Sequence, residues 1–250
     1  MTKRKIILWS VASVFIIFEA VLFCLIHFVR PDTDFNMRYA SIVGAVVFSW
    51  LTLGIELILA KVEKRDIKDI LFSKTNGNLI RIAMLFTLVA DFFMVALDKV
   101  NNLAGVTVFL GTQLFICLHI IYNEKNKKVN TIQIIIRYVL SLILICVVGV
   151  ILGKSTDLMS IISTVYYANL CINAAFAHRS GKGGIMLTIG LVLFALCDIN
   201  VGLAGLDSIY GGSPEGSLLY NLLNADIDLI WVFYIPSQTL IPLTLLLRDE

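Results

Sequence analysis

The sequence predicts an all-α membrane protein in which eight transmembrane helices form one bundle. Of the 250 residues, 58% are hydrophobic and only 15% are charged, against roughly 25% charged in an average soluble domain. Apolar runs of about 20 residues, the length that crosses a bilayer, recur eight times. The charged side chains lie almost entirely between these runs, as expected for helices that cross hydrocarbon.

The eight predicted spans follow one another along the chain. They cover 163 residues but hold only seven of the 38 Asp, Glu, Lys and Arg side chains. We therefore expect a single polytopic membrane domain over residues 1–250. The predicted spans are Ile6–Val29, Ala40–Ala60, Leu79–Leu97, Gly105–Tyr122, Ile132–Leu152, Leu158–Phe176, Gly184–Leu203 and Ile227–Leu247.

The first four spans differ in the charges that they carry. The first span is too long for the apolar region of a signal peptide, and no small-residue cleavage site follows it, so we expect it to be retained. The second and third spans contain Glu56 and Arg81 near one end, where long side chains can reach the lipid interface. The fourth span has no charged residue.

The last four spans are equally apolar. The fifth carries Arg137 near its start, and we expect this side chain to extend to the interface as well. The sixth is uncharged, and the seventh contains Asp198. The eighth begins beside Asp228, whose charge favours a helix N-terminus, and contains Pro236, which neighbouring helices can accommodate.

The distribution of Lys and Arg between the spans predicts the orientation. The termini and the linkers on the same side as the termini carry 14 of these residues, whereas the linkers on the other side carry 4. Because basic loops stay in the cytoplasm, we expect both termini to be cytoplasmic. The protein is then a multi-pass component of the plasma membrane.

Two linkers are long enough to have structure of their own. Segment 61–78 places Ile67, Ile70, Leu71 and Phe72 at helical spacing among charges, which predicts a short amphipathic helix on the membrane surface. Segment 204–226 contains a turn with Ser213 as a candidate helix cap and Pro214 in the first helical turn. This second segment is either a lid over a cavity or an ordinary interfacial loop.

Three carboxyl groups are expected at a similar depth in the membrane. Glu19, Asp91 and Asp198 differ in depth by only a few ångströms at the helical rise of ~1.5 Å per residue. A carboxylate in hydrocarbon needs a partner, a watery cavity or a proton, so such residues are functional by default. We therefore take Asp91 and Asp198 as candidate catalytic residues.

Polar side chains without charge lie near the same layer. Several recur on one helix face, at spacings of three and four residues. They line a polar cavity or, alternatively, form hydrogen bonds that hold the helices together. Together with Glu19, the candidate substrate-binding residues are Gln113, Tyr166, Asn169, Tyr234 and Gln238.

Other functional classes lack their sequence signals. All five cysteines lie within spans, and no Cys or His spacing predicts a metal site. The chain has no Ser-His-Asp spacing, no Gly-rich phosphate loop and no basic patch for nucleic acid. We expect neither a metal nor an organic cofactor, and the oligomeric state is left open.

A short internal similarity joins the third and seventh spans, LFTLVAD (85–91) and LFALCD (193–198), which suggests two parallel halves. The sequence around these aspartates resembles the lysoplasmalogenase-like YhhN family of eight-helix membrane proteins. The residues that carry the resemblance are LFTLVADFFM (85–94), AGVTVFLGTQLFI (104–116), GIMLTIGLVLFALCDINVGLAG (184–205) and WVFYIPSQTLI (231–241).

The resemblance implies hydrolysis of the vinyl ether bond of a lysoplasmalogen, which releases a fatty aldehyde and a glycerophospho-ethanolamine or -choline. It also implies that Asp91 and Asp198 are an acid/base pair and that the partner is a lysophospholipid drawn from the membrane lipids. The chain departs from the family pattern at Ala90, where Gly is usual, and at Gln113, where His is frequent. The usual Lys-Pro pair of the second span is absent, with Arg38-Tyr39 nearby.

The chemistry also fits the residues themselves. Vinyl ether hydrolysis needs a proton for the enol ether carbon and water for the resulting cation, so one neutral carboxylic acid and one carboxylate suffice. Two alternatives remain. The carboxyls could relay protons or cations in a transporter, or the protein could bind lipids without catalysis.

Overall fold

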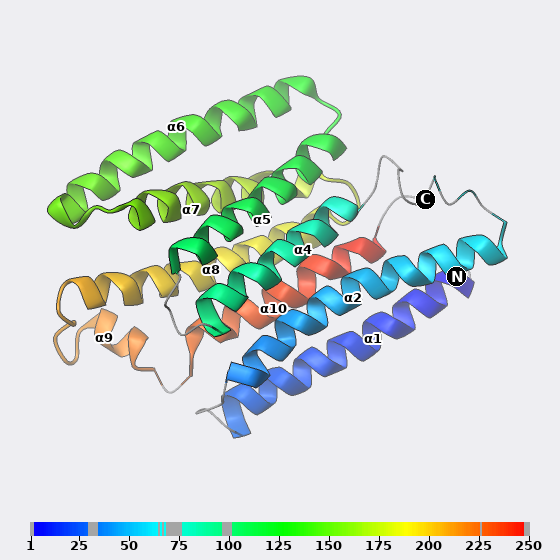
Figure 1. Ribbon diagram of the computed structural model, residues 1–250, viewed down its shortest axis with the longest axis horizontal. Helices are drawn as coiled ribbons and strands as arrows, with labels where there is room; N and C mark the ends of the chain where they lie inside the picture. Colours follow the sequence, from blue (N-terminus) through cyan, green and yellow to red (C-terminus); the bar gives the residue numbers. More distant parts are fainter. Residues whose placement is uncertain are drawn as a thin grey trace.

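The computed structural model describes residues 3–29, 35–64, 66, 68, 77–96, 102–225 and 227–247. These residues form a helical bundle with no strand in the described ranges (Figure 1). The long helices are α1 (Lys3–Cys24, continued by the π-helix η1, Leu25–Val29), α2 (Phe35–Val62), α4 (Asn78–Asp91, continued by the π-helix η2, Phe92–Ala96), α5 (Asn102–Asn123), α6 (Lys127–Leu152, with the 3-10 turn η3, Gly153–Ser155), α7 (Leu158–Phe176, with η4, Ala177–Arg179), α8 (Gly184–Ile209) and α10 (Leu229–Leu243, with η5, Thr244–Leu246).

Each of the eight predicted spans is confirmed as a helix long and apolar enough to cross a membrane. Helices α1, α2, α5, α6 and α8 extend three to six residues beyond one end of the predicted apolar run. The largest difference is at α8, which ends at Ile209 rather than Leu203. Asp228 caps α10 as expected, since its side chain accepts a hydrogen bond from the backbone N–H of Ile230 at 3.2 Å.

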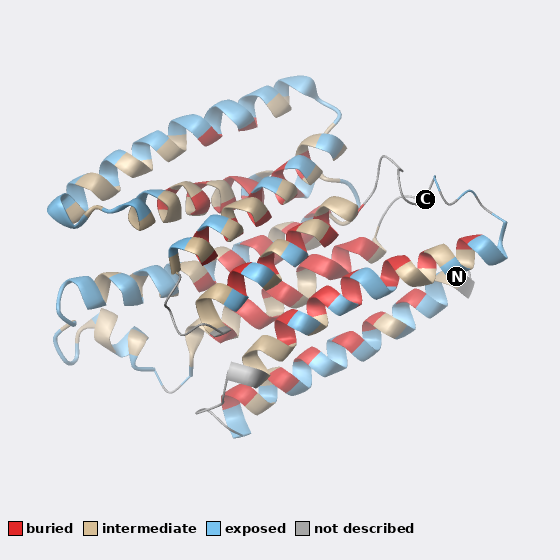
Figure 2. Cartoon of the chain, viewed as in Figure 1, coloured by how far each residue is buried: buried red, intermediate tan, exposed pale blue. Residues whose placement is uncertain are grey.

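Helix α10 lies at the centre of the bundle and α6 at its edge. α10 packs against α8, α2, α1 and α4, whereas α6 packs mainly against α7. Figure 2 shows the consequence: red, buried residues run through α10, while α6 is mostly exposed or half-buried. The exposed residues of α6 are largely Val, Leu and Ile, such as Val150 at 84%. An apolar outer face of this kind is what lipid requires.

Close helix contact depends on glycine at two positions near the candidate site. A Cβ added at Gly105 of α5 would lie 3.2 Å from the backbone carbonyl oxygen of Ala90 and 2.3 Å from Cγ of Met94. A Cβ at Gly190 of α8 would lie 2.9 Å from Cγ1 of Ile241 in α10. Small residues of this kind allow the backbones of membrane helices to approach.

Three charged residues that were expected at the lipid interface are buried instead. Arg81 is 0% exposed, and its Nε donates to the carbonyl of Ser49 at 2.8 Å. Glu56 is also buried and pairs with Arg4 at 3.4 Å. Arg137 points into the bundle at 8% exposure. The prediction was wrong because partners on neighbouring helices, which the sequence does not place, satisfy these groups inside the protein.

The segment between α8 and α10 contains a short helix, α9 (Leu218–Leu223). Its cap is Ser217, whose Oγ accepts from the N–H of Tyr220 at 3.1 Å, so the predicted cap at Ser213 was wrong. Ser213 instead donates a hydrogen bond to Asp207. In the other long linker, the expected amphipathic residues Ile67, Ile70, Leu71 and Phe72 lie outside the described residues.

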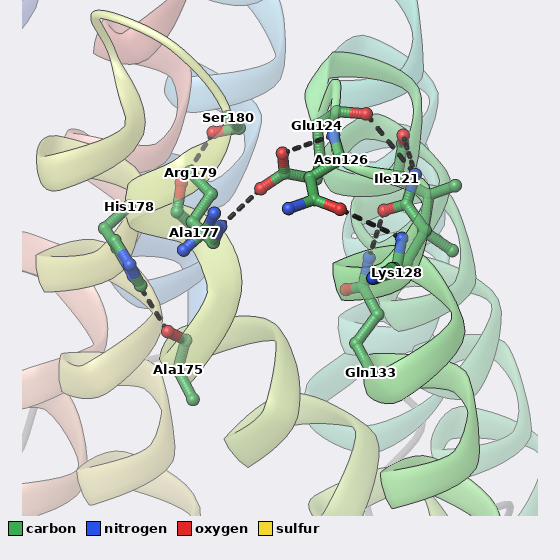
Figure 3. A network of polar contacts seen from close by, with 11 residues as sticks. Ile121, Glu124, Asn126, Lys128, Gln133, Ala175, Ala177, His178, Arg179 and Ser180 are labelled. Atoms are coloured by element: carbon green, nitrogen blue, oxygen red, sulfur yellow. Dashed lines mark hydrogen bonds and ion pairs between the residues drawn. The ribbon is translucent and has the colours of Figure 1, made fainter.

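One end of the bundle, which we call the basic end, holds the start of α1 and the end of α10 (Figure 1). A polar network there joins the α5–α6 linker to η4 (Figure 3). Glu124 accepts hydrogen bonds from Arg179 and from the backbone N–H of Asn126, the latter at 2.8 Å. The hydrogen bond from Arg179, and to a smaller extent that from Asn126, holds the pKa of Glu124 below its usual range.

Candidate functional site

Asp91 is the last residue of α4 and lies where the helix changes from α to π geometry. Such changes in helical geometry are frequent at functional sites. The carboxyl is buried, with 4% of the residue exposed, and its Oδ2 accepts a hydrogen bond from the hydroxyl of Tyr234 in α10.

Asp198 has an equivalent partner on another helix. Its Oδ2 accepts a hydrogen bond of 2.5 Å from the hydroxyl of Tyr166 in α7. Tyr166 is buried, whereas Asp198 is half-buried. Each aspartate is thus held by one tyrosine, and we call these four residues the carboxyl–tyrosine centre.

Two phenylalanines join the halves of the carboxyl–tyrosine centre. Phe109 of α5 lies with its ring centroid 5.7 Å from Tyr166 and 5.7 Å from Phe194 of α8. Phe194 in turn lies 5.5 Å from Tyr234. The four polar groups therefore belong to one site with an aromatic wall.

Sequence reasoning missed Phe109 and Phe194, because a phenylalanine in an apolar span is indistinguishable from lipid-facing residues. One signal was available. Phe194 precedes Asp198 by four residues and Phe109 precedes Gln113 by four, so each shares a helix face with a predicted site residue.

Gln113 and Asn169 belong to a different group of polar side chains. The guanidinium of Arg137 donates to Oδ1 of Asn169 at 2.9 Å and to Oδ1 of Asn173 at 2.7 Å. The amide of Asn173 donates to Oε1 of Gln113 at 2.9 Å. We call these four residues the arginine–amide cluster. Its hydrogen bonds run between α5, α6 and α7, and the structure joins none of the four to an aspartate by a hydrogen bond between described residues.

Gln238 lies one helical turn from Tyr234 on the same face of α10. The residue is fully buried, and neither its Nε2 nor its Oε1 has a hydrogen-bond partner within the described part of the chain. It therefore offers a donor and an acceptor beside the carboxyl–tyrosine centre.

Glu19 lies between α1 and α2. It is 2% exposed, and its Oε2 accepts a hydrogen bond of 2.5 Å from Ser41. The added Cβ at Gly44 would lie 3.2 Å from its Oε1, so the carboxyl is packed against α2. No hydrogen bond or ion pair between described residues joins Glu19 to Asp91 or Asp198.

A chain of contacts runs from the carboxyl–tyrosine centre to the end of the bundle opposite the basic end. The ring of Trp231 lies edge-on to Tyr234, with centroids 5.3 Å apart. The guanidinium of Arg38 lies over Trp231 at 5.3 Å and forms an ion pair with Asp228 at 3.0 Å. A cavity of about 600 Å³ opens beside these residues.

A larger cavity of about 990 Å³ lies at the basic end, between the end of α5 and the turn before α8. It is remote from the aspartates, because Asp198 lies 14 residues along α8 from Gly184, or about 21 Å at the helical rise. Within the described ranges, no group of three or more His, Cys, Asp and Glu side chains could hold a metal ion.

One of the comparisons with known proteins gives a match. The sequence model of the YhhN family matches residues 52–245, and the chain belongs to this family. The match includes both aspartates and both tyrosines of the carboxyl–tyrosine centre. No curated protein and no solved structure shows significant similarity to the chain.

Proposed function

We propose that this member of the YhhN family hydrolyses the vinyl ether bond of lysoplasmalogens, releasing a fatty aldehyde and glycerophospho-ethanolamine or -choline. The observation that carries the proposal is the carboxyl–tyrosine centre. Two carboxyls from α4 and α8 lie in one aromatic-walled site, each oriented by a tyrosine hydroxyl. Such a pair can supply both an acid and a base without a further reagent.

The reaction proceeds in three steps, each of which moves a proton. In its neutral form, one carboxyl donates a proton to the β-carbon of the vinyl ether, and the adjacent carbon becomes an oxocarbenium ion. The other carboxyl, as carboxylate, stabilises this cation and accepts a proton from the attacking water. The hemiacetal then collapses: its hydroxyl gives a proton to the first carboxyl, now a carboxylate, and the second carboxyl, now protonated, gives its proton to the leaving glycerol oxygen. This step releases the aldehyde and the alcohol and returns both carboxyls to their starting forms.

The surroundings suit a reaction of this kind. The rings of Phe109 and Phe194 limit access of water to the site and can stabilise a cation through their faces. The unpartnered amide of Gln238 can hold the attacking water or the glycerol oxygen. The hydrocarbon tail of the lipid lies between helices, where the protein surface is apolar.

The placement in the cell follows from the charges. The chain is a multi-pass membrane protein, and we assign it to the cell membrane with both termini in the cytoplasm. In this orientation the carboxyl–tyrosine centre lies nearer the outer surface, and lysophospholipids enter from the surrounding bilayer.

The test is aldehyde release from a lysoplasmalogen by the purified full chain in detergent. Asp91→Asn and Asp198→Asn should each lower turnover by at least about 100-fold, the usual contribution of an acid or base. Asp157→Asn is the matched control, because this exposed residue caps α7 and Asn caps a helix as well as Asp. It should retain activity.

Absence of turnover by folded wild-type protein on any vinyl ether lipid would contradict the proposal. The alternatives would then be separated by transport of protons or cations into sealed vesicles and by lipid binding without turnover. Loss of activity in only one aspartate variant would also contradict an acid/base pair.

A further inference from the structure

The cavity of about 600 Å³ lies at the end of the bundle opposite the basic end, where α8 ends and α10 begins. The residues from Leu222 to Ala225 form part of its wall. They belong to the end of α9 and the loop after it, which lie beside the end of α8 and the start of α10 (Figure 1). Its volume is in the range of small-molecule sites. The segment that contains α9 therefore lines a cavity.

The cavity is near the carboxyl–tyrosine centre. Asp228 at its wall precedes Tyr234 by six residues, and Ala204 follows Asp198 by six residues. Six residues of α-helix correspond to about 9 Å. A glycerol backbone and its phosphate are of comparable length, so a lipid with its reactive bond at the aspartates would place its phosphate in this cavity.

The charges of the cavity are mixed. Among the described residues that line the cavity, Arg38 is positively charged, and Asp207 and Asp228 are negatively charged. The Nε of Arg38 is buried and has no hydrogen-bond partner in the described part of the chain. His27 lies at the same wall, and its Nε2 is 3.4 Å from the backbone carbonyl oxygen of Asp228. One cation beside carboxylates complements a zwitterion that carries a phosphate and an ammonium group.

The geometry points to this cavity as the site for the glycerophospho-head group of the lysolipid, with Arg38 binding the phosphate and Asp207 facing the ammonium group. The inference rests on the proposed function, because the position of the reactive bond fixes that of the head group. In the absence of lipid, Asp228 neutralises Arg38, and the phosphate would replace this carboxylate as the partner of the guanidinium.

The contact chain from the head-group cavity to the carboxyl–tyrosine centre gives Arg38 a positioning role. Its guanidinium lies on Trp231, and Trp231 contacts Tyr234, the hydrogen-bond donor to Asp91. A phosphate that fixes Arg38 also fixes this aromatic pair and hence the carboxyl.

The kinetic test compares two substrates with the same alkenyl tail: a lysoplasmalogen and the corresponding alkenylglycerol, which lacks the phosphate and the ammonium group. Arg38→Gln should raise KM for the lysoplasmalogen at least about tenfold, since a charged hydrogen bond to phosphate is lost. Its KM for the alkenylglycerol should stay within about twofold. An equal effect on both substrates, or on neither, would overturn the inference.

A second variant separates binding of phosphate from a structural role of the ion pair. Asp228→Asn removes the partner of Arg38 but keeps the helix cap, because Asn and Asp cap equally well. If Arg38 only maintains the fold, Asp228→Asn should impair turnover as Arg38→Gln does. If Arg38 binds phosphate, Asp228→Asn should lower KM for the lysoplasmalogen, because the guanidinium no longer has a competing partner.

A binding measurement makes the test independent of catalysis. The wild type and Arg38→Gln are titrated calorimetrically with an alkyl-ether lysophosphatidylethanolamine, which cannot be cleaved, and with the matching alkylglycerol. If Arg38→Gln binds the phospholipid about tenfold or more weakly than the wild type does, the head-group site is supported even if no vinyl ether is hydrolysed. If the wild type hydrolyses the lysoplasmalogen but Arg38→Gln binds the phospholipid as tightly as the wild type does, the head-group site is overturned and the hydrolase proposal stays intact.

Discussion

The carboxyl–tyrosine centre and the arginine–amide cluster are both polar, but their charges are satisfied in different ways. In the cluster, the guanidinium of Arg137 has two amide oxygens as acceptors, and Asn173 is fully buried with all of its groups engaged. In the centre, each aspartate accepts a hydrogen bond from one tyrosine among the described residues. A guanidinium keeps its charge and holds helices together through its hydrogen bonds, whereas carboxyls can exchange protons.

The comparison predicts that the two regions respond differently to substitution. Asn173→Leu removes the hydrogen bond that Asn173 accepts from the buried guanidinium of Arg137. It also removes the two hydrogen bonds, each of 2.9 Å, that the amide of Asn173 donates to the backbone and side-chain oxygens of Gln113. It should destabilise the fold by about 3 kcal/mol or more, as for other broken buried charge contacts. Thermal unfolding in detergent measures this loss.

The folded fraction of Asn173→Leu should keep the specific activity of the wild type within a few-fold. Asn169→Leu is the matched comparison: Asn169 is half-buried and its Oδ1 makes one bond to Arg137, so the loss of stability should be smaller. A folded Asn173→Leu protein as inactive as Asp91→Asn would place the cluster in the reaction centre instead.

The tyrosines should give the opposite result. Tyr234→Phe and Tyr166→Phe each keep the ring but remove the hydrogen bond to one aspartate. A hydrogen bond to a charged group is worth about 1.5–3 kcal/mol, which corresponds to roughly a 10- to 150-fold loss of kcat. Steady-state aldehyde release measures the loss, and the melting temperature serves as the control.

The two tyrosine variants also sharpen the assignment of roles. The acid and the base titrate on opposite limbs of a bell-shaped pH–rate profile. Each tyrosine contacts a different carboxyl, so each variant should move a different limb of the profile. If both variants move the same limb, or neither moves one, the two carboxyls do not act as separate acid and base.

Hydropathy predicted the eight spans because a helix in lipid must be apolar over its length, whatever its neighbours are. It also predicted Asp91, Asp198, Tyr166 and Tyr234, since these polar groups stand out within apolar runs. The direction of Arg137 could not be predicted. Helix rotation is set by packing, and the long side chain can reach either the interface or the bundle interior.

The same limit applies to Glu19. Its position along the first span predicts a depth within the carboxyl layer, but depth does not determine the face from which a side chain projects. The structure places it against Ser41 at the contact of α1 and α2. A sequence pattern that assigns depth but not helix rotation therefore groups residues whose side chains point to different parts of the bundle.

Glu19→Gln tests this separation. The substitution replaces a carboxyl that has one hydrogen-bond partner among the described residues. The new amide oxygen can still accept the hydrogen bond from Ser41. Stability should be unchanged or slightly higher, because an uncharged group costs less to bury, and aldehyde release should stay within about twofold of the wild type. Activity as low as that of Asp198→Asn would return Glu19 to the site.

The smallest effect is expected at the basic end, where Glu124 is held by Arg179 outside the membrane spans. Because the pKa of Glu124 is lowered in the folded protein, its contribution is complete above the unfolded value near 4.3 and is lost as the pH falls through the folded value. Glu124→Gln should remove this part of the acid sensitivity. The difference is below about 1 kcal/mol, since Arg179 is 39% exposed and water screens the pair. Melting temperatures of both proteins between pH 7 and pH 3 give the measurement, and parallel curves at all pH values would show that the pair adds no pH-dependent stability.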